Sequence, residues 1–334
     1  MSGVWEKTEL SDALKSRGGG EKGVIDYNKL ITKKNLWRAW RLFARGKWKK
    51  KAVKMFWMDL EKNLNQLYHD LATERYIHGS YRHFVVQDTK RRDVYVATVR
   101  DRVVHQMVSE HLDYLYGRHF YRYSCAAQKD KGTSFARVCV LKIIKRLKNR
   151  RPVWVGKLDV KHYFRHIRHD ILLALLKRKI ADEKIIGLCE KIISSFGVFG
   201  LGLPLGNFTS QWLANIYLHE IDWWIKHTLK VRYYIRYNDD LLVTGTEKDQ
   251  VGNWIKAIQR YADKQLSLQI PDNKTEVVGL PRPVDILGLR TNGDRVWLRS
   301  KTVRKAKRKL LIKEINLAPE FLDTVCSYRG MKIF

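Results

Sequence analysis

The sequence predicts an α+β fold in which helices cover an antiparallel sheet. Three observations support this class. Phe56–Tyr76 and Val99–Tyr116 repeat apolar residues at helical spacing, whereas Tyr81–Ala97 and Val231–Gly245 have the short alternating runs of β-hairpins. Val153–Val160 is an apolar run typical of a buried strand. A chain of 334 residues has room for two or three subdomains.

The chain is strongly basic, with 65 Lys and Arg against 34 Asp and Glu and a net charge of +31. Because this surplus is spread over the whole length, it favours a polyanionic partner, and nucleic acid is the first candidate. No run approaches the ~20 apolar residues of a membrane span and no signal peptide is recognised, so we expect a cytoplasmic protein with no membrane partner. The four cysteines are widely spaced, which supports neither a zinc site nor a disulfide framework.

The N-terminal part is first polar and then basic. Residues 1–30 are expected to form a flexible leader. Ile31–Lys54 carries ten Lys or Arg residues interleaved with aromatic residues, and Leu36, Trp40 and Phe43 fall on one helical face. Such a helix could follow a phosphate backbone. The alternative is a solvated face over a core stripe.

A basic β-hairpin is expected at Tyr81–Ala97, with cations near its tip. Arg92 could hold a triphosphate through two hydrogen bonds, and Lys90 could act as a point charge. An edge strand protected by charge is the alternative. The helices Val99–Tyr116 and Ser134–Leu147 follow.

Further helices are expected after the glycine-rich turn Gly197–Gly206. One begins near Thr209 or Ser210, and another covers Asp249–Leu266. Arg299–Lys313 carries eight cations in fifteen residues, on one side of an amphipathic helix. We expect that side to lie along a duplex backbone, the alternative being a solvated face. The cations assigned to this interface are Arg299, Lys301, Arg304, Lys305, Lys307 and Arg308.

The hairpin Val231–Gly245 has the acidic tetrapeptide Tyr237-Asn238-Asp239-Asp240 at its turn. Two adjacent carboxylates repel each other, and bound Mg²⁺ is a usual way to offset that cost. A solvated Asn-Asp turn is the alternative. A third carboxylate, Asp159, ends the predicted strand Val153–Val160 and belongs either to a site or to a helix N-cap.

Asp159 and Asp239 suit a two-metal nucleotidyl transfer. In that chemistry two Mg²⁺ ions ~3.5–4 Å apart activate a primer 3′ hydroxyl and stabilise the leaving pyrophosphate. Such a pair needs carboxylates from different strands, and Mn²⁺ could replace Mg²⁺. Strand alternation predicts that Asp239 shares a face with Tyr237 while Asp240 points elsewhere, which makes Asp240 the weaker ligand or a supporting residue.

Several sequence blocks resemble, in order and rough spacing, the signature blocks of reverse transcriptases. They are Asp159-x-x-x-Tyr163-Phe164, LPLGNFTSQ at 203–211, YNDD at 237–240, NKT at 273–275, ILGLR at 286–290 and the segment 90–106. The resemblance implies a right-hand polymerase fold. Its parts would be basic N-terminal helices and fingers at 31–152, a palm at 153–290 with a fingers insertion near 170–203, and a short helical thumb at 291–334.

The block Leu205–Gln211 (LGNFTSQ) resembles the enzymes of diversity-generating retroelements. In that family the enzyme copies a template-repeat RNA into cDNA with frequent errors at adenines, aided by a small basic, oligomeric accessory protein. The resemblance therefore implies template RNA, a cDNA/RNA duplex, dNTPs and such a protein as partners. The alternatives are another bacterial reverse transcriptase, whether retron-like, intron-derived or defence-associated, and a catalytically idle RNA-binding protein.

The resemblance also implies roles for individual residues. Asp159, Asp239, Asp240 and the Val160 carbonyl would ligate the metals. Tyr163 would exclude a ribose 2′-OH, and Leu205 would loosen base selection because it can only pack against the nucleotide. The other implied nucleotide contacts are Lys90, Arg92, Lys161, His162, Gly206, Gln211 and Lys274, with Lys274 acting on the pyrophosphate and Gly206 letting the backbone approach.

Overall fold

The computed structural model of the chain describes residues 26–87, 91–149 and 152–315. These residues form two compact units, each assembled from segments that are distant in sequence. The first unit comprises the described residues up to Tyr121, together with Val160–Trp224 and Gln259–Ile270, and the second comprises the described residues of Arg122–Asp159, Ile225–Ile258 and the described residues from Pro271 onward. No helix in the described ranges is both long and apolar enough to cross a membrane.

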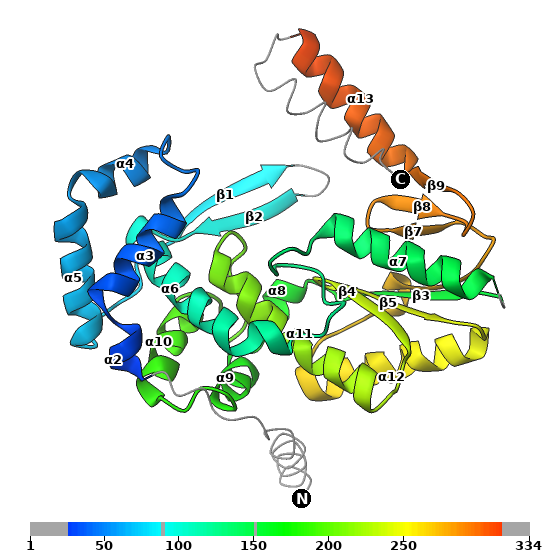
Figure 1. Cartoon of the computed structure of the whole chain (residues 1–334), viewed down its shortest axis with the longest axis horizontal. Coiled ribbons are helices and arrows are strands. Elements are labelled where there is room, and N and C mark those ends of the chain that lie inside the picture. The colour runs from blue at the N-terminus through cyan, green and yellow to red at the C-terminus, as the bar shows by residue number, and fades with distance from the viewer. Residues whose placement is uncertain (1–25, 88–90, 150–151, 316–334) are drawn as a thin grey trace, which may run out of the picture. The chain divides into compact units, whose positions relative to one another are not determined.

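Helices make up most of the first unit (Figure 1). The predicted stripe of Leu36, Trp40 and Phe43 is buried on α3, whose start is capped by the hydroxyl of Thr32. The single basic helix expected over Ile31–Lys54 is wrong, because the chain turns after α3, where Gly46 has φ 71°. The helices are α2 (Tyr27–Leu30), α3 (Lys33–Ala44), α4 (Lys51–Met58), α5 (Leu60–Ala72), α6 (Val99–Tyr116), α8 (Tyr163–His166), α9 (His169–Lys177) and α10 (Glu183–Ser194).

The predicted basic hairpin is confirmed. Strands β1 (Arg82–Gln87) and β2 (Arg91–Val96) pair antiparallel over their full length. The tip, residues 88–90 with Lys90, lies outside the described residues. Helix α11 (Phe208–His227) begins within two residues of the predicted start, and Trp224 packs on Tyr261 with the ring centroids 4.4 Å apart.

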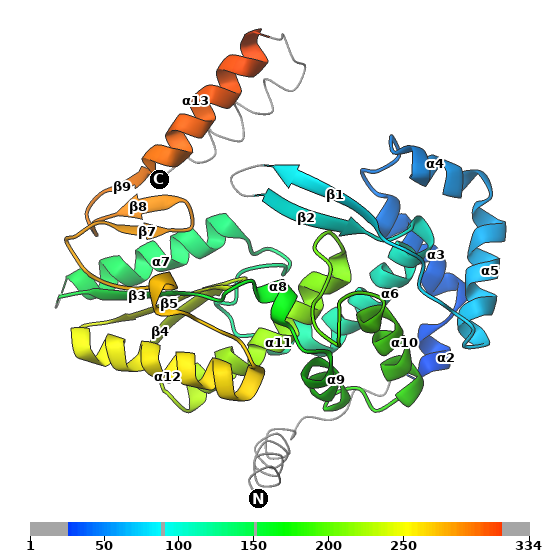
Figure 2. The same ribbon diagram turned by 180° about the vertical axis from the view of Figure 1, so that it is seen from behind.

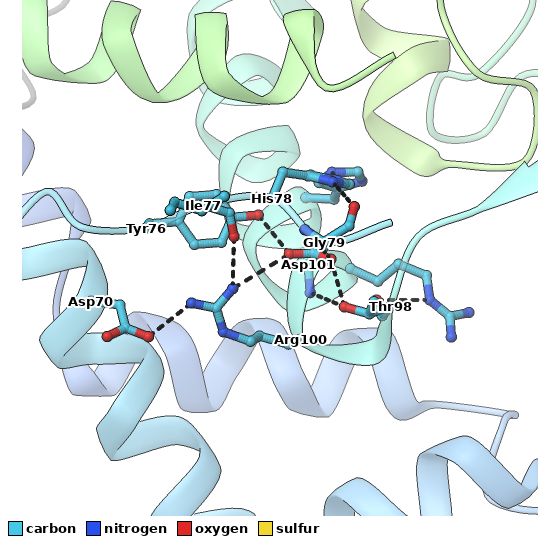
Figure 3. A network of polar contacts seen from close by, with 10 residues as sticks. Asp70, Tyr76, Ile77, His78, Gly79, Thr98, Arg100 and Asp101 are labelled. Carbon is cyan, nitrogen blue, oxygen red and sulfur yellow. Dashed lines mark hydrogen bonds and ion pairs between the residues drawn. The ribbon is translucent and has the colours of Figure 1, made fainter. Parts of the chain in front are cut away.

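A polar network in the first unit surrounds the buried carboxylate of Asp101 (Figure 3). The Asp101 carboxylate accepts hydrogen bonds from the hydroxyls of Tyr76, at 2.9 Å, and Thr98, at 2.5 Å. Arg100 lies 3.6 Å from the same carboxylate and donates to Asp70 at 2.8 Å. Because these donors surround it, Asp101 remains stable with none of its surface exposed.

An antiparallel sheet forms the centre of the second unit. Its strand order is β4-β5-β3-β6, so that β3 lies between β5 and β6 while β4 is at the edge. The strands are β3 (Trp154–Asp159), β4 (Tyr233–Tyr237), β5 (Asp240–Gly245) and β6 (Thr275–Gly279). The strand predicted at 153–160 and the hairpin predicted at 231–245 are thus confirmed.

Helices cover both faces of this sheet (Figures 1 and 2). On one face, α7 (Thr133–Lys148) contributes Ala136, Val140 and Ile144 to a core shared with residues of all four strands. On the other face lies α12 (Lys248–Leu266). A Cβ on Gly156 of β3 would lie 2.8 Å from a side-chain atom of Val251, so glycine allows α12 to approach the sheet.

A smaller sheet of order β7-β8-β9 follows, and α13 (Ser300–Ile315) confirms the basic helix predicted over Arg299–Lys313. Its strands are β7 (Val284–Ile286), β8 (Leu289–Thr291) and β9 (Val296–Leu298). The segment Asp285–Arg290 is a hairpin, because Leu287 and Gly288 both adopt positive φ between β7 and β8.

Candidate active site

Three carboxylates gather at one end of the large sheet in the second unit. Asp159, the last residue of β3, is directly opposite Asp240, the first residue of β5. Asp240 is also opposite Tyr237 on β4. Residues directly opposite in an antiparallel pair project from the same face, so Asp159, Asp240 and Tyr237 share a face. Asp239 lies in the turn that joins β4 to β5.

The faces expected from strand alternation are therefore wrong at this turn. Asp240, not Asp239, is paired with Tyr237 and shares its face. The reason is that Asn238 and Asp239 form a two-residue turn, in which Asn238 has φ 52°, so strand alternation does not hold across it. Asp240 is consequently a stronger candidate for a direct role than its sequence position suggests.

The electrostatics of the site reflect this crowding. Burial raises the pKa of Asp240 to about 6, and the charges of Asp239 and Asp159 act in the same direction. The cations Lys157 and Arg299 oppose that shift. Lys274, in the 3₁₀ turn Asp272–Lys274, forms an ion pair with Asp159. The predicted pyrophosphate contact is thus bound to a carboxylate of the site.

The donor set has the chemistry of a divalent cation site. Hard cations such as Mg²⁺ prefer carboxylate oxygens, and the mutual repulsion of three carboxylates is what such a cation would relieve. Within the described ranges, no three His, Cys, Asp or Glu side chains are already grouped closely enough to hold a metal ion. Lys274 instead supplies the positive charge at Asp159.

Arg236 is a residue of this site that the sequence analysis missed. It lies on β4 and is 0% exposed, yet it carries a guanidinium. Nη1 donates to the carbonyl of Asn238 at 3.2 Å, and Nη2 donates to the hydroxyl of Ser124 at 2.8 Å. Its backbone also pairs with the segment Tyr123–Cys125. The signal in the sequence was a cation inside an otherwise apolar strand, YYIRY.

The first residue of α7 also contacts the hairpin formed by β4 and β5. The hydroxyl of Thr133, the first residue of α7, donates to the Tyr237 hydroxyl at 2.8 Å. Tyr237 therefore has partners on both sides, since its backbone pairs with β5. This contact brings the N-terminus of a 16-residue helix, which carries a partial positive charge, near the acidic end of the sheet.

Most of the described residues that are predicted to contact the nucleotide lie in the first unit, whereas Lys274 lies in the second. Val160 is fully buried directly after β3, Lys161 is exposed, and His162 precedes α8 with φ 47°. Tyr163 is only 3% exposed, and its hydroxyl donates to the Ala214 carbonyl. An effect of Tyr163 on a ribose would therefore come from its ring rather than from its hydroxyl.

Two of the predicted contacts, Leu205 and Gly206, precede α11, and Gln211 lies in its first turn. Arg92 is exposed on β2. The Leu205 carbonyl accepts from the Tyr95 N–H at 2.8 Å, and Leu205 is partly exposed. Gly206 has φ 118°, and a Cβ there would lie 2.7 Å from the side chain of Val94. The glycine is thus required by its contact with β2, whereas the sequence suggested an approach to the nucleotide.

The six predicted duplex contacts lie directly before or on α13. Arg299 precedes the helix, lies 3.9 Å from Asp285 and acts on the charge of Asp240. Among the other five, Lys305 is half-buried. The four exposed cations are Lys301, Arg304, Lys307 and Arg308. One side of the described part of α13 therefore presents a row of cations.

Carboxylates at the end of an antiparallel sheet, in an α+β fold, are a donor set that suits metal-assisted phosphoryl transfer. Comparison with known families makes this specific. Residues 86–291 match the family model described as reverse transcriptase (RNA-dependent DNA polymerase). The chain belongs to the reverse transcriptase family.

Several similar curated proteins are named as intron proteins. The group II intron-encoded protein LtrA of Lactococcus lactis is 22% identical over 268 residues, covering 60% of this chain and 44% of LtrA. The putative COX1/OXI3 intron 1 protein of Saccharomyces cerevisiae is 27% identical over 175 residues, covering 49% of this chain and 20% of that protein. The matched region thus spans less than half the length of these relatives.

Among solved structures, the apo telomerase from Candida tropicalis, truncated from its C-terminal domain, is similar in fold. The TM-score is 0.50 at 12% sequence identity, and the match covers 70% of this chain and 60% of the telomerase chain. This likeness confirms the predicted α+β fold of the right-hand polymerase class.

Proposed function

We propose that the chain is an RNA-directed DNA polymerase in which Asp159, Asp239 and Asp240 hold two divalent metal ions, Mg²⁺ by preference. The observation that carries the proposal is the register that sets Asp159 opposite Asp240, with Asp239 in the adjoining turn. Metal ions held there would activate the primer 3′ hydroxyl and neutralise the leaving pyrophosphate. The Val160 carbonyl would complete the ligand set.

The chain's own residues would orient the nucleotide. Lys274 neutralises Asp159 here, and it would turn to the pyrophosphate once Asp159 binds another cation. Arg92 and Lys90 would contact the triphosphate, because guanidinium and ammonium groups suit phosphate oxygens. The ring of Tyr163 would exclude a ribose 2′-OH and so select dNTPs. Lys161, His162, Gly206 and Gln211 are the further proposed contacts.

The proposal assigns residues 31–152 to basic helices and fingers, 153–290 to the palm and 291–334 to the thumb. The six cations on and before α13 would lie along the cDNA/RNA duplex. Within the family, we propose the diversity-generating subtype, in which a template-repeat RNA is copied with errors at adenines and a small basic accessory protein assists. Leu205 supports this subtype, since its side chain can pack but cannot hydrogen-bond. A cytoplasmic location remains a prediction of the sequence.

Substitution of the acidic residues tests the polymerase. Asp239→Asn and Asp240→Asn should each abolish Mg²⁺-dependent primer extension on an RNA template while leaving RNA affinity nearly unchanged. Asp263→Asn is the matched control, because Asp263 is exposed on α12. Synthesis retained by both site variants would refute the proposed metal ligands.

The error spectrum tests the subtype. Copies of a defined RNA should carry misincorporations concentrated opposite adenine, and Leu205→Gln should reduce them. Leu42→Gln, at a comparably exposed leucine on α3, should have no effect. An even, low error spectrum in the unchanged chain would instead favour the second candidate, an intron-type reverse transcriptase, which the similarity to LtrA supports.

A further inference from the structure

The first unit contains a cavity of about 870 Å³ that the proposed catalytic chemistry does not use. It is lined by residues of β1 and β2, by the segment 164–166, and by the segment 195–205 that precedes α11. Leu205 is at its edge, so the cavity adjoins a residue to which we assign base selection. Nothing in the polymerase chemistry explains the composition of its walls.

One wall of the cavity is a continuous row of rings. The Phe196 ring meets Tyr81 edge-on with the centroids 5.6 Å apart, and meets Tyr95 with the centroids 4.7 Å apart. Tyr95 in turn stacks on His83 at 4.7 Å. The Tyr81 hydroxyl is hydrogen-bonded to Ser195 at 2.8 Å, which fixes that end of the row. Such a wall is aromatic, polarisable and already ordered, so it can pack against a planar ring either edge-on or in a stack.

A strained turn presents one more ring beside this wall. Val198 and Leu201 exchange backbone hydrogen bonds of 3.2 and 3.1 Å, so Phe199 and Gly200 form a two-residue turn. Both residues are left-handed, with φ 52° and 73°, a conformation that normally selects Asn, Asp or Gly. Phe199 is nevertheless 99% exposed. A phenylalanine that is 99% exposed buries almost no apolar surface, and residues held in a sparsely populated backbone conformation cluster at ligand-binding sites, which points to a role in binding.

The charges in the cavity limit what could bind there. Arg165 donates to Asp93 at 2.8 Å, and His83 lies 3.1 Å from the same carboxylate. One guanidinium thus faces one carboxylate, and this balance does not suit the several charges of a free triphosphate. The Arg165 side chain is 70% exposed, so it has donors left for a single phosphodiester. Aromatic rings combined with one available guanidinium suit a strand of single-stranded nucleic acid.

We propose that this cavity binds an unpaired base of the RNA strand, with Phe199 stacking on the base and Arg165 contacting an adjacent phosphate. The site deepens the proposed polymerase function, because the unpaired strand would be template that has not yet been copied. It would hold that strand in a fixed orientation without reading its sequence, since every base offers a flat face to a ring. Binding itself requires neither metal nor synthesis.

The test compares two fluorescein-labelled RNA/DNA primer-templates without divalent metal, one blunt and one with a four-nucleotide unpaired RNA overhang. The dissociation constants are measured by anisotropy. We expect the overhang to lower the dissociation constant of the unchanged protein. Phe199→Ala should weaken binding to the overhang substrate by about fivefold or more, as the loss of stacking between a base and an aromatic ring predicts. Phe199→Trp should restore the gain, and Tyr114→Ala, a change at a 63% exposed aromatic residue on α6 that does not line the cavity, should preserve it.

An overhang that carries abasic sites completes the experiment. If Phe199 stacks on a base, removing the bases should weaken binding to the unchanged protein and have little further effect on Phe199→Ala. Equal losses of Phe199→Ala on blunt and overhang substrates, or full competition by a free ribonucleoside triphosphate, would overturn the proposal. Because Asp239→Asn should bind both substrates normally, failure of this site and failure of the proposed polymerase chemistry can be told apart.

Discussion

Replacing Arg236 should loosen the turn that carries Asp239. Its guanidinium, buried on β4, donates to the Asn238 carbonyl and to the Ser124 hydroxyl. Asn238 has φ 52°, so its carbonyl direction is not one that a free chain would commonly choose. Arg236 therefore fixes the turn from the strand that precedes it, and it acts on catalysis through the position of Asp239.

The expected size of the effect follows from these contacts. Arg236→Met removes these two hydrogen bonds from a charged donor, worth roughly 1.5–3 kcal/mol each, so the free energy of unfolding should fall by about 3–6 kcal/mol. Ser124→Ala removes one of them and should cost about 1.5–3 kcal/mol. Because the two changes share one contact, the double variant should lose less than the sum of the single variants. Urea denaturation measures all three.

The functional measurement is the Mg²⁺ concentration that gives half-maximal primer extension. We expect Arg236→Met to raise it by about five- to tenfold, corresponding to roughly 1–1.4 kcal/mol of lost ligand positioning. Arg236→Lys keeps the charge but has fewer oriented donors, so its half-maximal Mg²⁺ concentration should lie between those of the unchanged protein and Arg236→Met. A variant that is less stable yet shows an unchanged Mg²⁺ dependence would refute the reasoning, because Arg236 would then support only the fold.

Three further predictions concern a histidine, a glycine and a basic helix. Burial lowers the pKa of His105 to about 3. Below about pH 6.5 the imidazole of His105 is therefore protonated in the unfolded chain but not in the folded protein. Urea denaturation should show the free energy of unfolding falling by about 2 kcal/mol at pH 5, and His105→Gln should lose less. Gly206→Ala should destabilise by about 1–3 kcal/mol, whereas Gly187→Ala, inside α10 with open space around it, should not; equal effects would contradict the β2 contact. Replacing Arg304 and Lys307 by Gln should reduce the slope of log affinity against log salt for a cDNA/RNA duplex by up to about 1.8, and an unchanged slope would remove α13 from the interface.

The sequence predicts elements well where a long periodic pattern exists. Val99–Tyr116 is helical over the predicted range, and the hairpins are found where alternation ends at a polar turn. Prediction fails where one backbone conformation decides the outcome. The turn at Gly46, which has φ 71°, divides the predicted basic helix into two helices. A single positive φ is a local event that apolar periodicity does not encode.

The candidate site shows the same division. The carboxylates could be chosen from the sequence because Asp159 and the acidic pair follow apolar strands that a central sheet would bring together. Their faces could not, because the turn at Asn238-Asp239 changes which acid is opposite Tyr237. Contacts between residues that are distant in the sequence could not be predicted either. The ion pair of Lys274 with Asp159 and the hydrogen bond of Arg236 to Ser124 each join residues more than 100 positions apart.

The asparagine between Tyr237 and Asp239 has a reason in the backbone. A two-residue hairpin turn needs a residue that accepts positive φ, and Asn does so at lower cost than most side chains. The carbonyl that this conformation directs inward is the one that accepts from Arg236. Asn238 and Arg236 therefore act together, because the left-handed turn directs the acceptor carbonyl and the guanidinium hydrogen-bonds to it. Since Asp239 directly follows that carbonyl, its position depends on both.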